Sequence, residues 1–243
     1  MSARDIITAT SAKTGDIGAS FYFAPETVAR GKELGLDGFR FYFLGRGGVL
    51  GDVDAAVVHS AFGYFSPDLI GKMWTSAKER LDPRQAAREY IACAHNHGRA
   101  RLEGVAGLDA YVEAAGAVIA AADDSALTLF AGLRAEPVPG DAPAAAFHQA
   151  MVLRELRGSA HLVAITAVGL PSLVAHMIKR PNDVATFGWP DDAHTLTDDD
   201  RERHARAEEI TDSMLEAPYS VLSADQGAAL IAGVEAMHAA LSA

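Results

Sequence analysis

The sequence contains little that would point to a disulfide scaffold, a zinc finger or a β-sandwich. Cys93 is the single cysteine, which excludes an internal disulfide framework and a cysteine-based zinc cluster and is typical of a reducing compartment. Aromatic residues make up only 7% of the chain, while much of its 49% hydrophobic content is Ala, Leu and Val. This mixture suits closely packed helices better than sandwiched strands, so we predict an all-α fold.

Basic residues and long apolar runs are scarce as well. The formal net charge is -11 at pH 7, whereas nucleic-acid binding normally begins with a basic surface. No uninterrupted apolar run reaches about 18 residues, and the chain does not open with a charged segment followed by an apolar one. We therefore predict a cytoplasmic protein that has no membrane segment and whose charge disfavours nucleic acid as a partner.

Helix signals and prolines divide the chain into three parts. Residues 1–20, rich in small and hydroxyl side chains with weak periodicity, are expected to form a flexible arm. Residues 21–180 are expected to form a helical bundle, and residues 181–243 a helical segment packed on it. The run Phe39–Phe43 fits a strand and a helix equally well. Capping residues and periodicity predict helices over 25–34, 52–65, 67–74, 82–103, 108–122, 141–169, 171–179, 197–216 and 223–241.

The most informative segment is the helix predicted around residues 147–169, in which charges interrupt an apolar pattern. At about 100° per residue, Arg154, Arg157 and His161 share one face, and the opposite face is apolar too. A helix that is apolar nearly all round is normally central, so these polar side chains should be at least partly buried. Buried guanidinium groups need carboxylates, carbonyl groups or an anionic ligand beside them.

Two interpretations of this polar cluster are open. In the structural one, Glu155 together with Glu208 and Asp212 pairs with the arginines and fixes the docking of a late helix. In the functional one, Arg154 and Arg157 hold a carboxylate or phosphate, while His161 recognises the ligand or transfers a proton. We predict no metal site, because histidines on the same helix, such as His148 and His161, project about 140° apart.

The same segment resembles the LREhRGDGH…aaGL signature of an actinobacterial family of uncharacterised helix-turn-helix proteins. The resemblance spans approximately residues 22–222 and implies a helical fold with an appended winged-helix-like unit. It also implies a shared site at Arg46, Arg154, Arg157 and His161. The matching residues occur in three separate regions: Tyr42-Phe43-Leu44-Gly45-Arg46, Gly51, Phe62 and Phe65-Ser66-Pro67; Leu153-Arg154-Glu155-Leu156-Arg157-Gly158, His161 and Val168-Gly169-Leu170; Leu196-Thr197, Glu208 and Thr211-Asp212.

The chain departs from the family pattern in two places. Ser159-Ala160 stands where the family has an aspartate before the histidine, so a proton-transfer role for that carboxylate does not carry over. Only residues 190–195 separate Gly188-Trp189 from Leu196-Thr197, too few for a recognition helix of three turns. The acidic run Asp198–Asp200 beside them would repel phosphate. We expect a short, degenerate helix-turn-helix or winged-helix-like portion near the C-terminus.

Three functions compete on these grounds. The first is binding of an anionic or partly anionic small molecule by the bundle. The second is cofactor-independent acid/base catalysis on such a molecule, with His161 or Glu155 as proton carrier. The third is transcriptional regulation, which the family resemblance implies. The predicted ligand-binding residues are Arg46, His59, Arg154, Arg157, Tyr42 and Phe62.

Neither the cofactor nor the oligomeric state follows from the sequence. No motif identifies a cofactor. The Ala-rich helices predicted over 108–122 and 223–241 offer flat surfaces on which a second copy can pack as a homodimer, and the same composition suits internal packing.

Overall fold

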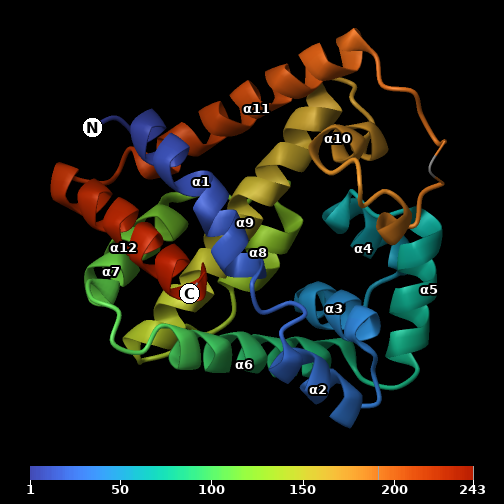
Figure 1. The fold of residues 1–243 in the computed structure, drawn as a ribbon, viewed down its shortest axis with the longest axis horizontal. Coiled ribbons are helices and arrows are strands. Elements are labelled where there is room, and N and C mark those ends of the chain that lie inside the picture. The colour runs from blue at the N-terminus through green and yellow to red at the C-terminus, as the bar shows by residue number, and fades with distance from the viewer. Residues whose placement is uncertain (191, 243) are drawn as a thin grey trace.

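A computed structural model describes residues 1–190 and 192–242 and shows an arrangement of helices around one central helix (Figure 1). No strand occurs in these residues, so the predicted all-α class is confirmed. The α-helices are α1 (Ala3–Ala19), α2 (Pro25–Glu33), α3 (Gly38–Gly47), α4 (Ala55–Phe62), α5 (Pro67–Lys78), α6 (Pro83–Arg101), α7 (Leu108–Ala121), α8 (Thr128–Arg134), α9 (Ala142–Ala167), α10 (Ser172–Lys179), α11 (Asp198–Tyr219) and α12 (Ala224–Ser242). Two short 3-10 helices are η1 (Gly48–Leu50) and η2 (Ala185–Phe187).

Side-chain caps fix the start of several helices where the sequence predicts them. Asp82 accepts a hydrogen bond from the Gln85 amide at the start of α6, and Asp141 accepts one from the Ala144 amide at the start of α9. Thr197 forms a capping box with Asp200 at the start of α11. Each cap satisfies a backbone donor that the first turn of a helix leaves free.

The first 20 residues differ from the expected flexible arm. Ser2 and Asp5 form a capping box, and α1 buries Ile6, Ile7 and Ile17 against its neighbours. The Ser, Thr, Gly and Ala residues that resembled a linker let α1 approach other helices closely. A Cβ added to Gly18 would lie 3.0 Å from a side-chain carbon of Arg154 on α9. Tertiary burial, which local propensity does not report, makes this segment a helix.

Helix α3 settles an ambiguous part of the sequence, and helix α8 is an element that the sequence pattern did not predict. The aromatic run that fitted either a strand or a helix lies in α3, whose first turn is capped by Asp37. Helix α8 was not predicted, because seven residues are too few to show a clear helical period. It packs against α9 with Leu129, Phe130 and Leu133 buried.

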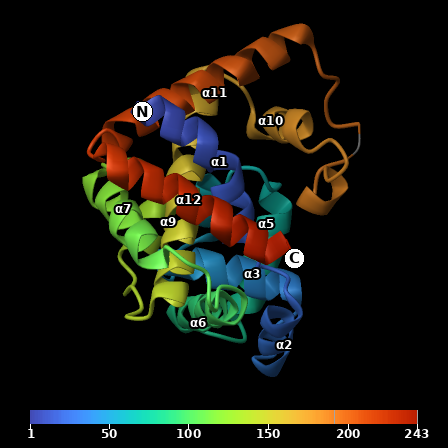
Figure 2. The same ribbon diagram turned by 60° about the vertical axis from the view of Figure 1, so that its left-hand side comes forward.

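Helix α9 is the centre of the molecule, as its apolar pattern predicts. It contacts α1, α6, α7, α8 and α11, and most of its residues are buried. Helix α12 packs against α1 and α7 (Figure 2). The Ala-rich surfaces of α7 and α12, which also suited a homodimer, therefore pack against each other within the chain. Gly233 makes this approach possible, since a Cβ there would meet the Tyr111 side chain at 2.6 Å.

The C-terminal end of α9 turns sharply into α10. The two helices are bent by 118° across residues 168–171, where Gly169 has a φ of +67°. Two helices that cross at about 90–120° through a short, glycine-containing turn match the geometry of a helix-turn-helix unit. A small second apolar cluster with Ile165, Val174 and Ala207 at its centre fills the space between α9, α10 and α11.

The residues around Gly188-Trp189 do not form the winged-helix-like unit that the resemblance implies. The indole N–H of Trp189 donates to the backbone oxygen of Tyr64, and Phe187 stacks on Phe65 with ring centroids 4.0 Å apart. No strand that could serve as a wing occurs within 1–190 or 192–242.

Within those ranges no single helix is long and apolar enough to cross a membrane. Helices α9 and α10 reach that length and apolar character only together, and they are bent by 118° relative to each other.

Candidate functional site

Two ionic clusters lie along α9, and the first is centred on Glu155. Arg46, in the last turn of α3, donates from Nε to Glu155 Oε1 at 2.9 Å and from NH2 to Oε2 at 2.8 Å. This is a two-pronged contact, the geometry in which a guanidinium binds a carboxylate most strongly. The Glu155 side chain is only 5% exposed and that of Arg46 14%. We call these residues, together with Arg154 and Tyr22, the inner cluster.

The other members of the inner cluster complete the coordination of Glu155. Arg154 donates from NH1 to Glu155 Oε1 at 2.9 Å, and the Tyr22 hydroxyl donates to the same oxygen at 3.5 Å. Burial by itself would raise the pKa of Glu155, but Arg46 and Arg154 outweigh it and hold the pKa below its usual value. The carboxyl group is therefore an anion at neutral pH and has no proton to donate.

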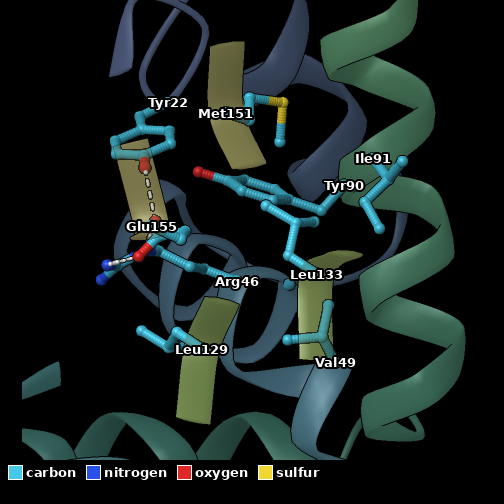
Figure 3. Close-up of a pocket in the computed structure, with 10 residues that line it drawn as sticks. Tyr22, Arg46, Val49, Tyr90, Ile91, Leu129, Leu133, Met151 and Glu155 are labelled. Atoms are coloured by element: carbon cyan, nitrogen blue, oxygen red, sulfur yellow. Dashed lines mark hydrogen bonds and ion pairs between the residues drawn. The ribbon is translucent and has the colours of Figure 1, made fainter. Parts of the chain in front are cut away.

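Aromatic rings surround Arg46 in the inner cluster. Its guanidinium carbon lies 4.4 Å from the centroid of Phe62, and its NH1 donates to the Tyr42 hydroxyl at 3.1 Å. A cavity of about 20 Å³ lies beside the ion pair, between Tyr22, Tyr90 and Met151 among others (Figure 3). That volume admits about one water molecule, so no organic ligand fits there.

The second cluster lies near the C-terminal end of α9, where α11 crosses it. Arg157 donates from NH2 to Glu208 Oε2 at 2.6 Å and lies 3.7 Å from Asp212 Oδ1. The ring nitrogen Nδ1 of His161 lies 2.8 Å from the hydroxyl of Thr211. We call these residues, together with His204, the outer cluster.

Glu208 is the hub of the outer cluster and is less enclosed than Glu155. Its side chain is 30% exposed, and its Oε1 lies 4.0 Å from His161 Nε2 and 3.9 Å from His204 Nε2. Within the described residues, this group of His161, His204 and Glu208 is the one whose ligand atoms all lie within 4.8 Å of each other, a proximity from which three side chains can converge on one metal ion. The predicted absence of a metal site rested on pairs of histidines from one helix, whereas these ligands come from two.

Burial and positive neighbours keep the imidazoles of the outer cluster neutral. Burial lowers the pKa of His161 to about 4; Glu208 opposes this shift, and Arg157, His204 and Lys179 reinforce it. Burial also lowers the pKa of His204. Neutral imidazoles carry a free nitrogen lone pair at neutral pH, which both metal ligation and proton acceptance require.

Tyr64, which sequence reasoning did not single out, lies close to both arginines of α9. Burial raises its pKa far above the usual value; Glu208 adds to this effect, while Arg157 and Arg154 oppose it. The phenol therefore remains protonated and can donate a hydrogen bond to an anion.

An open groove of about 390 Å³ lies on another side of α9, between α4, α8 and the second half of α9. No charged side chain lines it, so it lacks the chemistry to recognise an anion. His59 precedes Ser60 at its edge, and its Nε2 is buried without a hydrogen-bond partner in the described parts of the chain. The lining residues are small, hydroxylated or aliphatic: Ser60, Ala61, Ala126, Thr128, Ser159, Leu162, Val163, Thr166 and Ala167.

Most of the predicted site residues thus lie in the inner or the outer cluster, and His59 lies in neither. The inner cluster brings Arg46, Glu155 and Arg154 together, with Tyr42 and Phe62 around Arg46. The outer cluster brings together Arg157, His161, Glu208 and Asp212. No hydrogen bond or ion pair links His59 to either cluster in residues 1–190 and 192–242.

Sequence reasoning did not name Tyr22, Tyr64, His204 or Thr211 as site residues, although Thr211 lies in a segment that matches the family pattern. One signal was present for the last two, because His204, Glu208 and Thr211 lie four and three residues apart on a predicted helix and so share a face. No comparable signal existed for Tyr22 and Tyr64, which lie in connections between helices.

Comparison with known proteins gives a family and nothing finer. The model of a family described as the helix-turn-helix family matches residues 8–243. Because the match covers nearly the whole chain, the protein belongs to this family. Neither the curated proteins nor the solved structures contain a match.

Proposed function

We propose that this member of the helix-turn-helix family binds an anionic small molecule through Arg154 and Arg157, with His161 beside them. The observation that carries the proposal is a shortage of negative charge in the inner cluster. Arg46 and Arg154 share a single carboxylate, that of Glu155, so one of their two positive charges has no counter-charge within ion-pair distance in the described residues.

Arg154 retains donors that an anion can use. Its one hydrogen bond within the described residues runs from NH1 to Glu155, although a guanidinium carries five N–H donors. Its side chain is 27% exposed, so one edge of the guanidinium is accessible. The ring of Tyr22 lies under the guanidinium, 5.1 Å from its central carbon, and restricts its orientation.

Arg157 is one turn further along the same face and is also incompletely bonded. Its Nε is buried and has no hydrogen-bond partner in the described residues, while NH2 contacts Glu208. A buried donor left without a partner costs free energy, so the protein's own groups do not fully satisfy Arg157. Two arginines three residues apart present adjacent forks, which suits an anion with several oxygens.

The dimensions of the inner cavity restrict where the anion binds. The space of about 20 Å³ beside Arg46 holds about one water molecule, so the anion must contact the exposed edges of Arg154 and Arg157 instead.

The same location suits the alternative function, acid/base catalysis by His161. Glu155 is not suited to donate a proton, because two arginines hold it as an anion. We place this activity in the cytoplasm, a compartment in which a single free thiol such as Cys93 is ordinary.

The test is titration of the purified chain with citrate and inorganic phosphate by isothermal calorimetry. We expect Arg154→Gln and Arg157→Gln each to weaken binding by about tenfold or more, since hydrogen bonds to charged groups contribute about 1.5–3 kcal/mol. Arg206→Gln is the matched control, because Arg206 is a 66%-exposed arginine paired with Glu209 on α11. Equal affinity for both anions in the wild type, the control and an R154Q/R157Q double variant would refute the proposal.

Transcriptional regulation is a second candidate function, which the family and the corner between α9 and α10 favour. The surface around that corner opposes it. Helix α10 buries Val174, Ala175 and His176, and the exposed start of α11 is acidic. Electrophoretic mobility shifts with genomic fragments at low salt distinguish the two functions. A specific shift at low salt supports the regulator, and its absence there argues strongly against it.

A further inference from the structure

The outer cluster contains the donor set of a divalent transition-metal site. Two imidazoles and one carboxylate converge from α9 and α11, with one ligand atom of each within 4.8 Å of the others. Oε1 of Glu208 lies 4.0 Å from His161 Nε2 and 3.9 Å from His204 Nε2. His204 and Glu208 lie four residues apart on α11 and so point in the same direction. Two histidines and a carboxylate are the ligands of several catalytic zinc and non-haem iron sites.

The hydrogen bonds around His161 leave the correct nitrogen free for a metal. The Thr211 hydroxyl donates its single hydrogen to the backbone oxygen of Ala207 at 2.7 Å. It must therefore accept from His161, whose Nδ1 lies 2.8 Å away and carries the proton. In the neutral ring Nε2 is then unprotonated, and this is the nitrogen that faces Glu208 and His204. Metal-bound histidines in proteins are usually oriented in this way, by an acceptor that takes the hydrogen bond from the other ring nitrogen.

The two carboxylate oxygens of Glu208 also face different partners. Oε2 accepts from Arg157 at 2.6 Å, while Oε1 faces both histidines and makes no hydrogen bond within the described residues. The contact with Arg157 fixes the plane of the carboxylate and leaves one oxygen for the metal. An oxygen aimed at two neutral imidazole nitrogens about 4 Å away gains little from either of them, and a cation between the three would gain from all.

These residues assign the cluster to a divalent first-row transition metal such as Zn²⁺, and we propose it as a metal-binding site. Ligand atoms at about 2.0–2.1 Å from a tetrahedral zinc lie about 3.3 Å from each other, so the three side chains need to close by less than about 1.5 Å. Nitrogen donors favour zinc or ferrous iron over Mg²⁺ and Ca²⁺, which prefer oxygen. Because Glu208 is 30% exposed, the site opens towards solvent, and a fourth ligand can enter there.

The metal site does not depend on the anion-binding proposal. An open coordination position beside Arg157 would allow a bound anion to contact the metal as well, but the three ligands stand without it. Zinc binding is therefore measured in a buffer free of phosphate and carboxylates. Anion binding is measured on the chelator-treated protein, so that either proposal can fail without the other.

The experiment is calorimetric titration of the untagged full chain with ZnCl₂. We expect one Zn²⁺ per chain and a loss of at least about 100-fold in affinity for His161→Gln and for His204→Gln. The control is His238→Gln on α12, where a 35%-exposed histidine pairs with Asp16 away from the cluster. Zinc binding that is absent in the wild type, or that is unchanged in both ligand variants, overturns the proposal.

Two further measurements guard against misfolded variants and adventitious binding. Zn²⁺ at 100 times the dissociation constant should raise the melting temperature of the wild type and of the control but not of His204→Gln, whose fold is checked by circular dichroism. Thr211→Val retains all three ligands and removes only the acceptor that orients His161. We expect it to weaken zinc binding by about tenfold. Unchanged zinc affinity in Thr211→Val would contradict the role given to the Thr211 hydroxyl.

Discussion

The inner and outer clusters lie within two turns of α9, and they differ in how completely their polar groups are bonded. In the inner cluster, the 5%-exposed carboxylate of Glu155 accepts from two arginines and a tyrosine. In the outer cluster, one oxygen of the 30%-exposed Glu208 contacts Arg157, and the other faces two imidazoles without a hydrogen bond in the described residues. A saturated, buried carboxylate holds helices together, whereas an unsaturated and accessible one is available to a ligand.

The difference follows from which helices cover each part of α9. Around Glu155 the helix is enclosed, and α3 brings Arg46 across to close the remaining side. Further along, α11 crosses α9 with Ala207, Thr211 and Leu215 buried, and α10 turns away at 118°. The second half of α9 contributes to the less enclosed of the two clusters, to which Arg157 of the proposed anion site and the three proposed metal ligands belong.

The largest expected effect is the loss of Glu155. Glu155→Gln would leave the largely buried Arg46 and the partly exposed Arg154 without their shared counter-charge, so we expect the free energy of unfolding to fall by about 3–5 kcal/mol. Urea denaturation at pH 7 measures this change. Glu209→Gln, at a 62%-exposed ion pair on α11, is the control and should cost less than about 1 kcal/mol. If Glu155→Gln costs no more than this control, the inner cluster does not stabilise the fold.

A second prediction concerns acidification of the enclosed half of α9. His148 lies there at 1% exposure, bonded to His95 of α6, and burial lowers its pKa to about 4. In the unfolded chain its pKa is about 6.5, so the unfolded state takes up a proton first as the pH falls. Stability should therefore decline between pH 6.5 and pH 4.

His148→Gln isolates the contribution of this residue to the decline. Between pH 7 and pH 5 we expect the variant to lose less stability than the wild type, by on the order of 1–2 kcal/mol. Urea midpoints at the two pH values provide the measurement, and His238→Gln, at a partly exposed position on α12, is the control. A variant whose stability falls with pH as steeply as that of the wild type would show that His148 is not the group that titrates.

The smallest expected effect is at Glu208, and it sharpens the contrast most directly. Glu208→Gln breaks a partly exposed contact with Arg157, whose side chain is 29% exposed, so water can replace the lost interaction. We expect a loss of about 1 kcal/mol or less in urea denaturation without added metal. A loss as large as that of Glu155→Gln would show that both clusters are structural and that the outer one is not kept free for a ligand.

Much of the fold could be predicted from local residue patterns. Asp82, Asp141 and Thr197 begin helices where the sequence places them, because a cap acts on backbone amides only two or three residues away. The N-terminal segment shows the limit of such signals. Its helix depends on contacts with α9 and α12, and nothing within the segment itself reports those partners.

The candidate site shows the same division between local and distant information. The sequence by itself determined that Arg154, Arg157 and His161 share a face of a central helix, since the 3.6-residue period fixes side-chain directions along one helix. Only the tertiary structure decided that Arg46 binds Glu155, 109 residues further along the chain, and that His204 and Glu208 lie beside His161. The rotation and crossing of two helices depend on packing over their whole length, and no short pattern encodes this.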